Sequence, residues 1–457
     1  MMNAPEILNI QRNFFLSGKT KSIRFRISQL MKFRQILKEN ESLLFKAIDK
    51  DFGKSAYETY GTELSVIYSE IKSALKNIKK WSKPVQVRTT LKNFPGKGKI
   101  FHEPFGNTLI IGAWNYPYQL SLVPAVSAIA AGNTAIIKPS DLAANTSSVM
   151  ARLINENFDS GFLFLKEGGI AVSTELLKQK FDKIFFTGST SVGKIVYRAA
   201  AEHLTPVTLE LGGKSPAFVL PDADLARSAR RIAWGKFLNA GQTCVAPDYA
   251  LVHRNVKDEF LNKLKEQILK IHGKNPKDGE TYVRIINQKN FDRLLSLIEK
   301  NKIFWGGKTD REKLYISPTI ISGISFNDKI MNDEIFGPIL PVIEFSDLDC
   351  AIKEVKNKPK PLSLYIFTNS SAKRDRILHE ISFGGGCVND TVMHLASPEL
   401  PFGGVGLSGM GKYHGKAGFL AFSHSKSILY KGLWFEPFFK YKPYTSLKLK
   451  LLKWIME

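Results

Sequence analysis

The sequence predicts an α/β protein with two doubly wound, largely parallel sheets. Short apolar runs alternate with helix-length segments from residue 108 to residue 203, and a second alternation begins near Leu211. Strands that alternate with helices form parallel sheets covered on both faces, because each crossover lays a helix against the sheet. The 457 residues, of which 44% are hydrophobic, suffice for two or three domains with large cores.

The first 84 residues are predicted to form helices. In residues 27–53 and 61–84, apolar side chains recur at spacings of three and four, which places them on one helix face. The first pattern ends at Gly53 and the second at Pro84, two residue types that end helices. The basic segment that follows, residues 85–104, alternates in a way typical of a pair of strands.

No charged residue lies between Pro104 and Ile137, so this stretch has to be considered as a membrane span. Glycines, prolines and asparagines interrupt it, and a strand, a buried helix and a second strand fit it better. These three elements are expected at 108–114, 120–133 and 134–140. Charges early in the N-terminus argue against a secretion signal.

The later part of the chain repeats this alternation. A capped helix is expected at 145–158, and a strand–turn–helix unit at 183–203. Two strands are expected at 216–221 and 249–253, with a helix between them at 224–240. From Ser382 onward glycine becomes frequent, which indicates close backbone approaches rather than packed helices.

The three cysteines, Cys244, Cys350 and Cys387, have no close or even spacing. This usage is typical of a reducing compartment, and together with scattered histidines it predicts no metal site. Cys350 lies in a helical pattern and is predicted to be a core thiol, and Cys387 is predicted to be structural. Cys244 lies in "NAGQTCVAP", where a buried thiol, a metal ligand and a nucleophile are all candidates. Taken alone, the buried thiol is favoured.

Glu210 and the turn "TGSTSVGK" are candidate site features at strand ends. Glu210 ends an apolar strand before two glycines, so it fits a general base as well as a capping or ion-paired acid. The turn joins a strand to a helix and can hold a phosphate at the helix N-terminus. It nearly matches a nucleoside triphosphate loop, but Ile195 stands where a hydroxyl must bind Mg²⁺. A glycine turn without a ligand is the alternative.

Six short motifs, "WNYP", "KPS", "FTGST", "LELGGKSP", "GQTC" and "EIFGP", follow one another along the chain. Their order and spacing resemble those of aldehyde dehydrogenases across residues 20–430, and "LPFGGVGLSGMGKYHGKAGF" resembles the class 3 branch, which includes fatty aldehyde dehydrogenases. The resemblance implies an aldehyde dehydrogenase-like fold with a Rossmann-like cofactor domain, a catalytic domain, a small β oligomerisation element and a basic amphipathic tail. These parts are expected at 1–84 with 104–210, at 211–393, at 85–103 with 394–430, and at 431–457.

The resemblance also implies an activity, the NAD(P)-dependent oxidation of aldehydes to carboxylic acids. Medium- or long-chain aliphatic or aromatic aldehydes are the expected substrates. Cys244 matches the nucleophile, whose attack leads to a thiohemiacetal and then a thioester. Asn115 matches a donor to the oxyanion, and Glu210 matches the base for thioester hydrolysis. The residues expected to bind the cofactor are Trp114, Lys138, Gly188, Ser189, Gly193, Leu211, Gly212, Glu334 and Phe336.

Asp141 stands after "KPS", where the family often has glutamate. The shorter side chain repels a 2′-phosphate less, so NAD is expected, with NADP also accepted. The class 3 resemblance and the strand pair imply a homodimer. A non-catalytic binding or structural protein on the same fold is the alternative function, although Cys244, Glu210 and Asn115 are all present.

The net charge of +23 comes from 65 Lys and Arg against 42 Asp and Glu. Many lysines lie on amphipathic helices, so solvated basic surfaces are expected rather than a specific nucleic-acid site. The tail carries a broad apolar face of Leu447, Leu451, Leu452, Trp454 and Ile455. Packing on its own subunit or a dimer mate is favoured over contact with anionic lipid, which stays open. The expected location is the cytoplasm, with peripheral membrane contact as the alternative.

Overall fold

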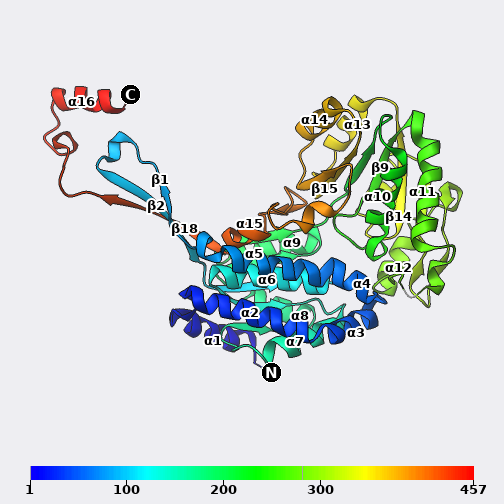
Figure 1. Cartoon of the computed structure of the whole chain (residues 1–457), viewed down its shortest axis with the longest axis horizontal. Helices are drawn as coiled ribbons and strands as arrows, with labels where there is room; N and C mark the ends of the chain where they lie inside the picture. Colours follow the sequence, from blue (N-terminus) through cyan, green and yellow to red (C-terminus); the bar gives the residue numbers. More distant parts are fainter. Residues whose placement is uncertain (1, 280, 457) are drawn as a thin grey trace.

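Figure 1 shows the computed structural model, which describes residues 2–279 and 281–456. Two large sheets, each with helices on both faces, form the body, and a three-stranded sheet projects from one end. The predicted α/β architecture with two doubly wound sheets is confirmed.

The first large sheet has six strands, and all neighbouring pairs except β17–β7 are parallel. In spatial order the strands are β17 (Gly409–Met410), β7 (Val207–Glu210), β6 (Lys183–Thr187), β3 (Asn107–Ile111), β4 (Thr134–Lys138) and β5 (Leu163–Leu165). Every residue of β3, β4 and β6 is buried, as parallel strands covered on both faces require.

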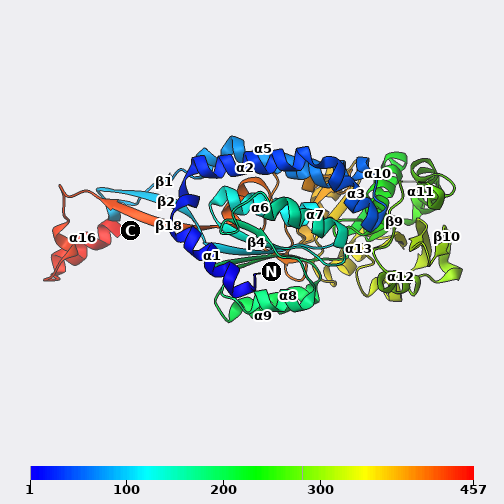
Figure 2. The same cartoon turned by 90° about the horizontal axis from the view of Figure 1, so that it is seen from below.

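Helices cover this six-stranded sheet on both faces. They are α1 (Ala4–Leu16), α2 (Ile23–Glu39), α3 (Glu41–Phe52), α5 (Ser65–Trp81), α6 (Pro117–Ala131), α7 (Ala144–Asn155), α8 (Ile170–Leu177) and α9 (Thr190–Ala201). The short helix α4 (Ala56–Thr59) lies in the segment between α3 and α5. Helices α2, α3, α5, α6 and α7 share a core with one face, while α1, α8 and α9 share a core with the other. Figure 2 shows α2 and α5 on one side of the sheet and α8 and α9 on the opposite side.

Helix α6 accounts for much of the uncharged stretch, and every one of its residues is buried. It links β3 to β4 inside the core, so the predicted strand–helix–strand arrangement is confirmed. Among the described residues, no helix is both long enough and apolar enough to cross a membrane.

The second large sheet has seven strands, and only the β10–β13 pair is antiparallel. In spatial order the strands are β10 (Ile303–Trp305), β13 (Thr319–Ile324), β14 (Ile339–Phe345), β9 (Tyr249–His253), β8 (Pro216–Val219), β15 (Ser363–Phe367) and β16 (Gly385–Val388). One face packs on α10 (Leu225–Phe237) and α11 (Lys257–His272), and the other on α12 (Gln288–Leu295), α13 (Leu348–Lys356) and α14 (Ser371–Glu380). A small two-stranded sheet pairs β11 (Thr309–Asp310) with β12 (Tyr315–Ile316).

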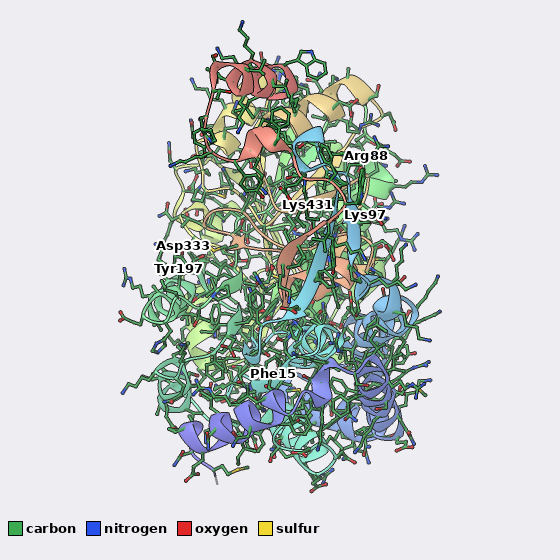
Figure 3. The ribbon with its side chains drawn as sticks, turned by 90° about the vertical axis from the view of Figure 1, so that its left-hand side faces the viewer. Phe15, Arg88, Lys97, Tyr197, Asp333 and Lys431 are labelled. Atoms are coloured by element: carbon green, nitrogen blue, oxygen red, sulfur yellow. The ribbon has the colours of Figure 1, made fainter. Side chains whose placement is uncertain are left out.

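The projecting sheet, hereafter the arm, joins β1 (Val85–Val87), β2 (Gly96–Pro104) and β18 (Ser423–Lys431) in antiparallel order. The strand pair expected at 85–104 is therefore confirmed. Strand β18 follows α15 (Gly415–Ala421), and α16 (Ser446–Met456) lies at the far end of the arm (Figure 1). Viewed from this end in Figure 3, Lys97 and Lys431 lie on the arm and Arg88 lies beside it.

The arm meets the first sheet at a short junction between β2 and β3. The backbone N–H of Gly106 donates to the side-chain oxygen of Asn133 (2.9 Å), and the N–H of Asn107 donates to Asp182 Oδ2 (2.8 Å). These two bonds fix the junction to the α6–β4 turn and to the start of β6.

Three local expectations are wrong. In the glycine-rich region after Ser382, where no packed helix is expected, α15 packs on α5 and α6. The helix expected at 224–240 ends at Phe237 and is followed by a 3₁₀ turn, Leu238–Gly241, in which Asn239 and Ala240 have left-handed backbone angles. Cys350 is exposed rather than a core thiol, because α13 turns Ala351, Ile352 and Val355 inward instead. Within the range 394–430, β17 joins the six-stranded sheet and β18 joins the arm.

Candidate active site

The predicted catalytic residues come from the facing edges of the two large sheets. Glu210 is the last residue of β7, at the carboxyl edge of the first sheet, and Asn115 lies between β3 and α6 at the same edge. Cys244 lies between the 3₁₀ turn and β9, at the amino edge of the second sheet. Glu334 precedes β14 at that second edge. Parallel strands thus deliver all four residues to one boundary.

Direct hydrogen bonds tie the Asn115 segment to the Cys244 segment. The side-chain amide of Asn115 donates to the backbone oxygen of Gln242 (3.1 Å), and the Tyr116 hydroxyl lies 2.6 Å from Thr243 Oγ1. Asn115 is almost fully buried, and Cys244 is half-buried. The structure therefore places the amide beside the loop that carries the thiol.

The thiol of Cys244 is held in its protonated form. Burial, followed by the negative charges of Glu334 and Glu210, raises the pKa of Cys244 to about 12. These interactions also show that both carboxyl groups lie within electrostatic reach of the sulfur. Because only the thiolate is nucleophilic, reaction at this sulfur requires that its proton be removed within the site.

Glu210 is buried, and neither carboxyl oxygen has a hydrogen-bond partner among the described residues. Burial raises the pKa of Glu210 well above its usual range, opposed by the positive charge of Lys412. Because its pKa is raised, this carboxyl group can take up a proton at neutral pH. An exposed glutamate, whose pKa is low, stays ionised at that pH. A Cβ at Gly403 would come within 3.0 Å of Glu210 Oε1, so the neighbouring glycine backbone gives this side chain its room.

Glu334 occupies space that a side chain at position 212 would fill, because a Cβ on Gly212 would collide with its carboxylate. Burial and the charge of Asp248 raise the pKa of Glu334 to about 8. The next residues are fixed as well: the N–H of Ile335 donates to Asp248 Oδ1 (3.0 Å), and Phe336 stacks edge-on against Trp114 at 5.4 Å. Glu334, Phe336, Trp114 and Gly212 therefore lie together.

The turn before α9 has the features of an anion site. Ser189 caps the helix, with its hydroxyl accepting from the N–H of Val192 (3.4 Å). The N–H of Gly188 donates to the backbone oxygen of Glu210 (3.0 Å), so the turn adjoins the end of β7. A Cβ at Gly193 would approach Leu211 Cδ2 to 2.6 Å, which shows how closely helix and strand pack. Free N–H groups at a helix N-terminus bind phosphate groups well.

Lys138 ends β4, so it lies at the same carboxyl edge but two strands away from β6 and its turn. Its side chain is buried, its ammonium donates to the backbone oxygen of Pro139 (2.9 Å), and burial lowers its pKa. The predicted cofactor residues thus run from Lys138 past the α9 turn along the carboxyl edge of the first sheet to Glu334 at the facing edge of the second sheet. These residues could hold an extended dinucleotide, and the free N–H groups at the start of α9 could hold its phosphate groups.

Several residues in contact with the candidate site had no recognised signal in the sequence. Asn239 donates through its side chain to the backbone oxygens of Asn115 (2.9 Å) and Gln242 (3.1 Å). Gln242 itself bonds to the backbone of Arg284 and Ile286. The hydroxyl of Tyr365 donates to the backbone oxygen of Val245, next to the thiol. Asn239 lies within the quoted cysteine stretch, but its type and position alone do not reveal these contacts.

Comparisons with known proteins point in one direction. A model described as the aldehyde dehydrogenase family matches residues 7–428. The chain is 48% identical over 442 residues to 4,4′-diaponeurosporen-aldehyde dehydrogenase of Staphylococcus aureus (strain NCTC 8325 / PS 47), covering 96% of each chain. It is 44% identical over 447 residues to aldehyde dehydrogenase family 3 member A2 of Rattus norvegicus, covering 97% of this chain and 92% of the relative.

Two further comparisons concern the cofactor and the fold. The dimeric NADP-preferring aldehyde dehydrogenase of Mus musculus is 43% identical over 433 residues, covering 95% of this chain and 96% of the relative. A solved structure of the substrate-bound state of Staphylococcus aureus AldH superposes with a TM-score of 0.97 at 46% identity, covering 100% of both chains.

Proposed function

Because this chain belongs to the aldehyde dehydrogenase family and oxidises aldehydes with NAD or NADP, we propose that Cys244 is the nucleophile of its active site. The resemblance to class 3 enzymes noted in the sequence is confirmed, and so is the expected activity. The observation that supports the assignment is that one thiol, one amide and one carboxyl group meet at the boundary between the two sheets, and that this carboxyl group has no hydrogen-bond partner among residues 2–279 and 281–456.

Asn115 stabilises the negative charge that the attack places on the carbonyl oxygen of the aldehyde. The Cys244 thiol first loses its proton to water in the site. When its sulfur then bonds to the aldehyde carbon, the carbonyl π bond breaks and the carbonyl oxygen gains a negative charge. The Asn115 amide has two hydrogens, of which one bonds to Gln242, so the second can donate to this oxygen. The backbone N–H of Cys244 supplies another donor. Oriented donors of this kind act strongly in a buried site, because they need no reorganisation during the reaction.

Glu210 acts in the second half of the reaction. Bound NAD or NADP supplies the acceptor for the hydride that leaves the aldehyde carbon, and a thioester on Cys244 remains. Glu210 then takes a proton from the water that attacks the thioester carbon. The carbon–sulfur bond breaks, the carboxylic acid is released and the thiol is restored. A carboxyl group with two free oxygens and a raised pKa suits this proton transfer.

The cofactor is held along the edge of the first sheet. We assign the pyrophosphate to the α9 turn with Gly188, Ser189 and Gly193, and the adenosine ribose to Lys138. The nicotinamide end is assigned to Glu334 and Phe336 at the second sheet. The remaining assigned contacts are Trp114, Leu211 and Gly212, which pack against these groups.

The roles of the thiol and the carboxyl group are tested by following NADH absorbance with a medium-chain aldehyde. Cys244→Ala is expected to form no NADH. Glu210→Gln is expected to release about one NADH per active site in a burst and then stall, because the thioester forms but is not hydrolysed. Equal steady rates in wild type and Cys244→Ala would refute the nucleophile assignment, and a Glu210→Gln variant that turns over without a burst would refute the base.

We propose that the substrates are medium- or long-chain aliphatic or aromatic aldehydes. Two relatives support a large apolar substrate class. One is named for a diaponeurosporen aldehyde. The other is a family 3 member, and the sequence resembles the class 3 branch that includes fatty aldehyde dehydrogenases. A series of aldehydes of increasing chain length tests this through kcat/KM, which should rise with chain length. A fall beyond the shortest members would contradict it.

We propose that the protein is a cytoplasmic homodimer whose tail packs on its own subunit or on the dimer mate, with contact between the tail and membranes as the alternative. Its three cysteines are free, as expected in a reducing compartment, and a relative is described as dimeric. The tail exposes Trp434, Tyr444, Leu447 and Trp454 beside several lysines, which suits an anionic lipid surface.

Sedimentation separates the proposal from its alternative. The intact protein should stay in solution with anionic vesicles, and a chain ending before Tyr441 should lose its dimeric mass if the tail packs on the dimer mate. If the intact protein sediments with the vesicles and the shortened chain does not, the tail contacts membranes instead.

A further inference from the structure

The segment that links α3 to α5 reaches across the boundary between the two sheets. It contains α4 and one π-helical turn, Tyr60–Leu64. In Figure 1, α4 lies beside the first sheet and its helices, at the end that faces the second sheet and its helices. From this segment the carboxylate of Glu58 accepts a hydrogen bond from the backbone N–H of Asn239 (2.9 Å). Glu58 thereby connects the N-terminal helices to the loop before Cys244.

The loop that Glu58 contacts has an unfavourable backbone. Asn239, Ala240 and Gly241 have φ angles of 52°, 50° and 72° in succession. Left-handed angles are disfavoured for residues with a Cβ, so this conformation persists only if surrounding contacts hold it. Gly241 has no space for a side chain, because a Cβ there would collide with the backbone of Gly337.

Asn239 passes the restraint on to the catalytic groups. Its side chain bonds the backbone oxygens of Asn115 and Gln242, and the Asn115 amide bonds the same Gln242 oxygen. Gln242 lies two residues before Cys244. A shift of Asn239 therefore moves the amide donor and the nucleophile together.

Buried charges fix the segment of chain that carries Glu58. Lys54 forms an ion pair with Glu63 (3.0 Å) in which both side chains are fully buried. The second oxygen of Glu63 accepts from the N–H of Tyr118 (2.8 Å), and the Lys54 ammonium lies 4.4 Å from the ring centre of Tyr116. The segment around Glu58 is thus attached to the start of α6, directly after Asn115.

We propose that Glu58 is a positioning residue, which holds the left-handed loop through Asn239 and so sets the geometry of Cys244 and Asn115. This inference rests on the proposed roles of those two residues. Its carboxylate acts as a hydrogen-bond acceptor and needs no charge for that role. Glutamine keeps an acceptor oxygen at the same distance along the side chain, whereas alanine removes it.

The test compares Glu58→Ala and Glu58→Gln with Glu41→Ala. Glu41 is a matched control, since it is also half-buried and also accepts one hydrogen bond, from the Tyr68 hydroxyl, but does not contact the loop. Glu58→Ala should lower kcat by about 10- to 100-fold with little change in KM, because misplacement of reacting groups affects the chemical step. Glu58→Gln should stay near wild type, and Glu41→Ala should be unchanged.

A second measurement needs neither aldehyde nor cofactor. Iodoacetamide labelling, resolved by peptide mass spectrometry, compares Cys244 with the exposed Cys350 in the same molecule. In Glu58→Ala, a loosened loop should expose the thiol, so Cys244 should react several-fold faster relative to Cys350. If Glu58→Ala does not fold, Glu58→Asp takes its place, because its side chain is one methylene too short to reach Asn239.

Two outcomes would overturn the proposal. One is a Glu58→Ala protein with unchanged kcat and unchanged labelling ratio. The other is an equal loss of activity and of melting temperature in Glu58→Ala and Glu58→Gln, which would indicate a structural requirement for the charge. If Cys244→Ala still oxidised aldehydes, the proposed function would fail, whereas the labelling ratio would still decide the role of Glu58.

Discussion

The cofactor turn and the nucleophile loop lie at the same boundary but are built in opposite ways. The turn before α9 is an ordinary helix start, capped by Ser189, with Val192 and Ile195 of the first turns exposed. The loop before Cys244 is buried and carries three left-handed residues in a row. It is bonded to three separate parts of the chain: to the carboxylate of Glu58 and, through the loop's own side chains, to the backbone oxygens of Asn115 and Arg284. The turn before α9 is stabilised by interactions within its own residues, whereas the conformation of the loop before Cys244 depends on contacts with distant segments.

This difference follows from what each part must do. A phosphate is bound by any helix N-terminus with free N–H groups, so local geometry is sufficient. A nucleophile must lie within a fraction of an ångström of its place relative to an oxyanion donor on another domain, and this requires contacts between distant segments. Substitutions should therefore be far more damaging in the loop than in the turn.

The largest effect is expected for Gly241→Ala. The new Cβ would meet the backbone of Gly337, and φ would remain positive. We expect the free energy of unfolding to fall by about 3 kcal/mol or more, together with loss of NADH formation. Denaturant unfolding and the NADH assay measure both. A stable, active variant would show that the loop is not restrained by its surroundings.

The next effect concerns the dependence of stability on pH. The pKa of Glu334 rises from 4.5 to about 8 on folding, because of burial. The folded state thus holds this proton more tightly, and the contribution to stability is complete below pH 4.5 and is lost as pH rises through about 8. Over this window the free energy of unfolding should fall as pH rises, by less than the loss expected for Gly241→Ala.

Glu334→Gln isolates this contribution, because it cannot ionise. Denaturant unfolding of both proteins at about pH 5 and about pH 8 should show a smaller decline in the variant. Identical declines would place the responsible groups elsewhere.

A smaller effect is expected for Gly193→Ala in the cofactor turn. Its Cβ would approach Leu211 Cδ2 to 2.6 Å, but that side chain can move, and alanine favours the helix. The free energy of unfolding should change by less than about 1 kcal/mol. The KM for NAD should rise by roughly tenfold, since a shifted Leu211 disturbs the edge beside the turn. A loss of stability as large as that of Gly241→Ala would remove the contrast between the two regions.

The smallest effect is expected for Asp141→Ala, at the exposed end of the cofactor edge. Removal of a solvated negative charge should raise kcat/KM for NADP relative to NAD by about fivefold, which corresponds to about 1 kcal/mol. Matched assays with the two cofactors measure the ratio. An unchanged ratio would show that Asp141 does not contribute to cofactor choice.

The contrast between turn and loop also explains what could be predicted from the sequence. The alternation of apolar runs and helical periods is a local property, and it predicts both sheets and the buried helix α6. The turn before α9 likewise has a local signature in its glycines and its capping serine. The thiol, Glu210 and Asn115 were selected because of the motifs that surround them, not because of their residue types.

The contacts that hold the loop could not be predicted in this way. Nothing in "NAG" marks Asn239 and Ala240 as left-handed, so the sequence predicts a helix that continues through them, whereas the helix ends at Phe237. Glu58 is one of many acids in helical segments, and its partner lies 181 residues away. The error at Cys350 is different in kind, because the periodicity of Ala351, Ile352 and Val355 already places Cys350 off the buried face.

The pinned junction between β2 and β3 affects how the arm can move. The backbone N–H groups of Gly106 and Asn107 bond to the side chains of Asn133 and Asp182. Two hydrogen bonds therefore hold the base of the arm to the first sheet and its helices. Bending of the arm, whether by thermal motion or by the pull of a bound surface, is absorbed on the outer side of this anchor. Movement of the arm, or of a surface bound to its tail, is therefore not passed on to β3, the strand that leads to Asn115.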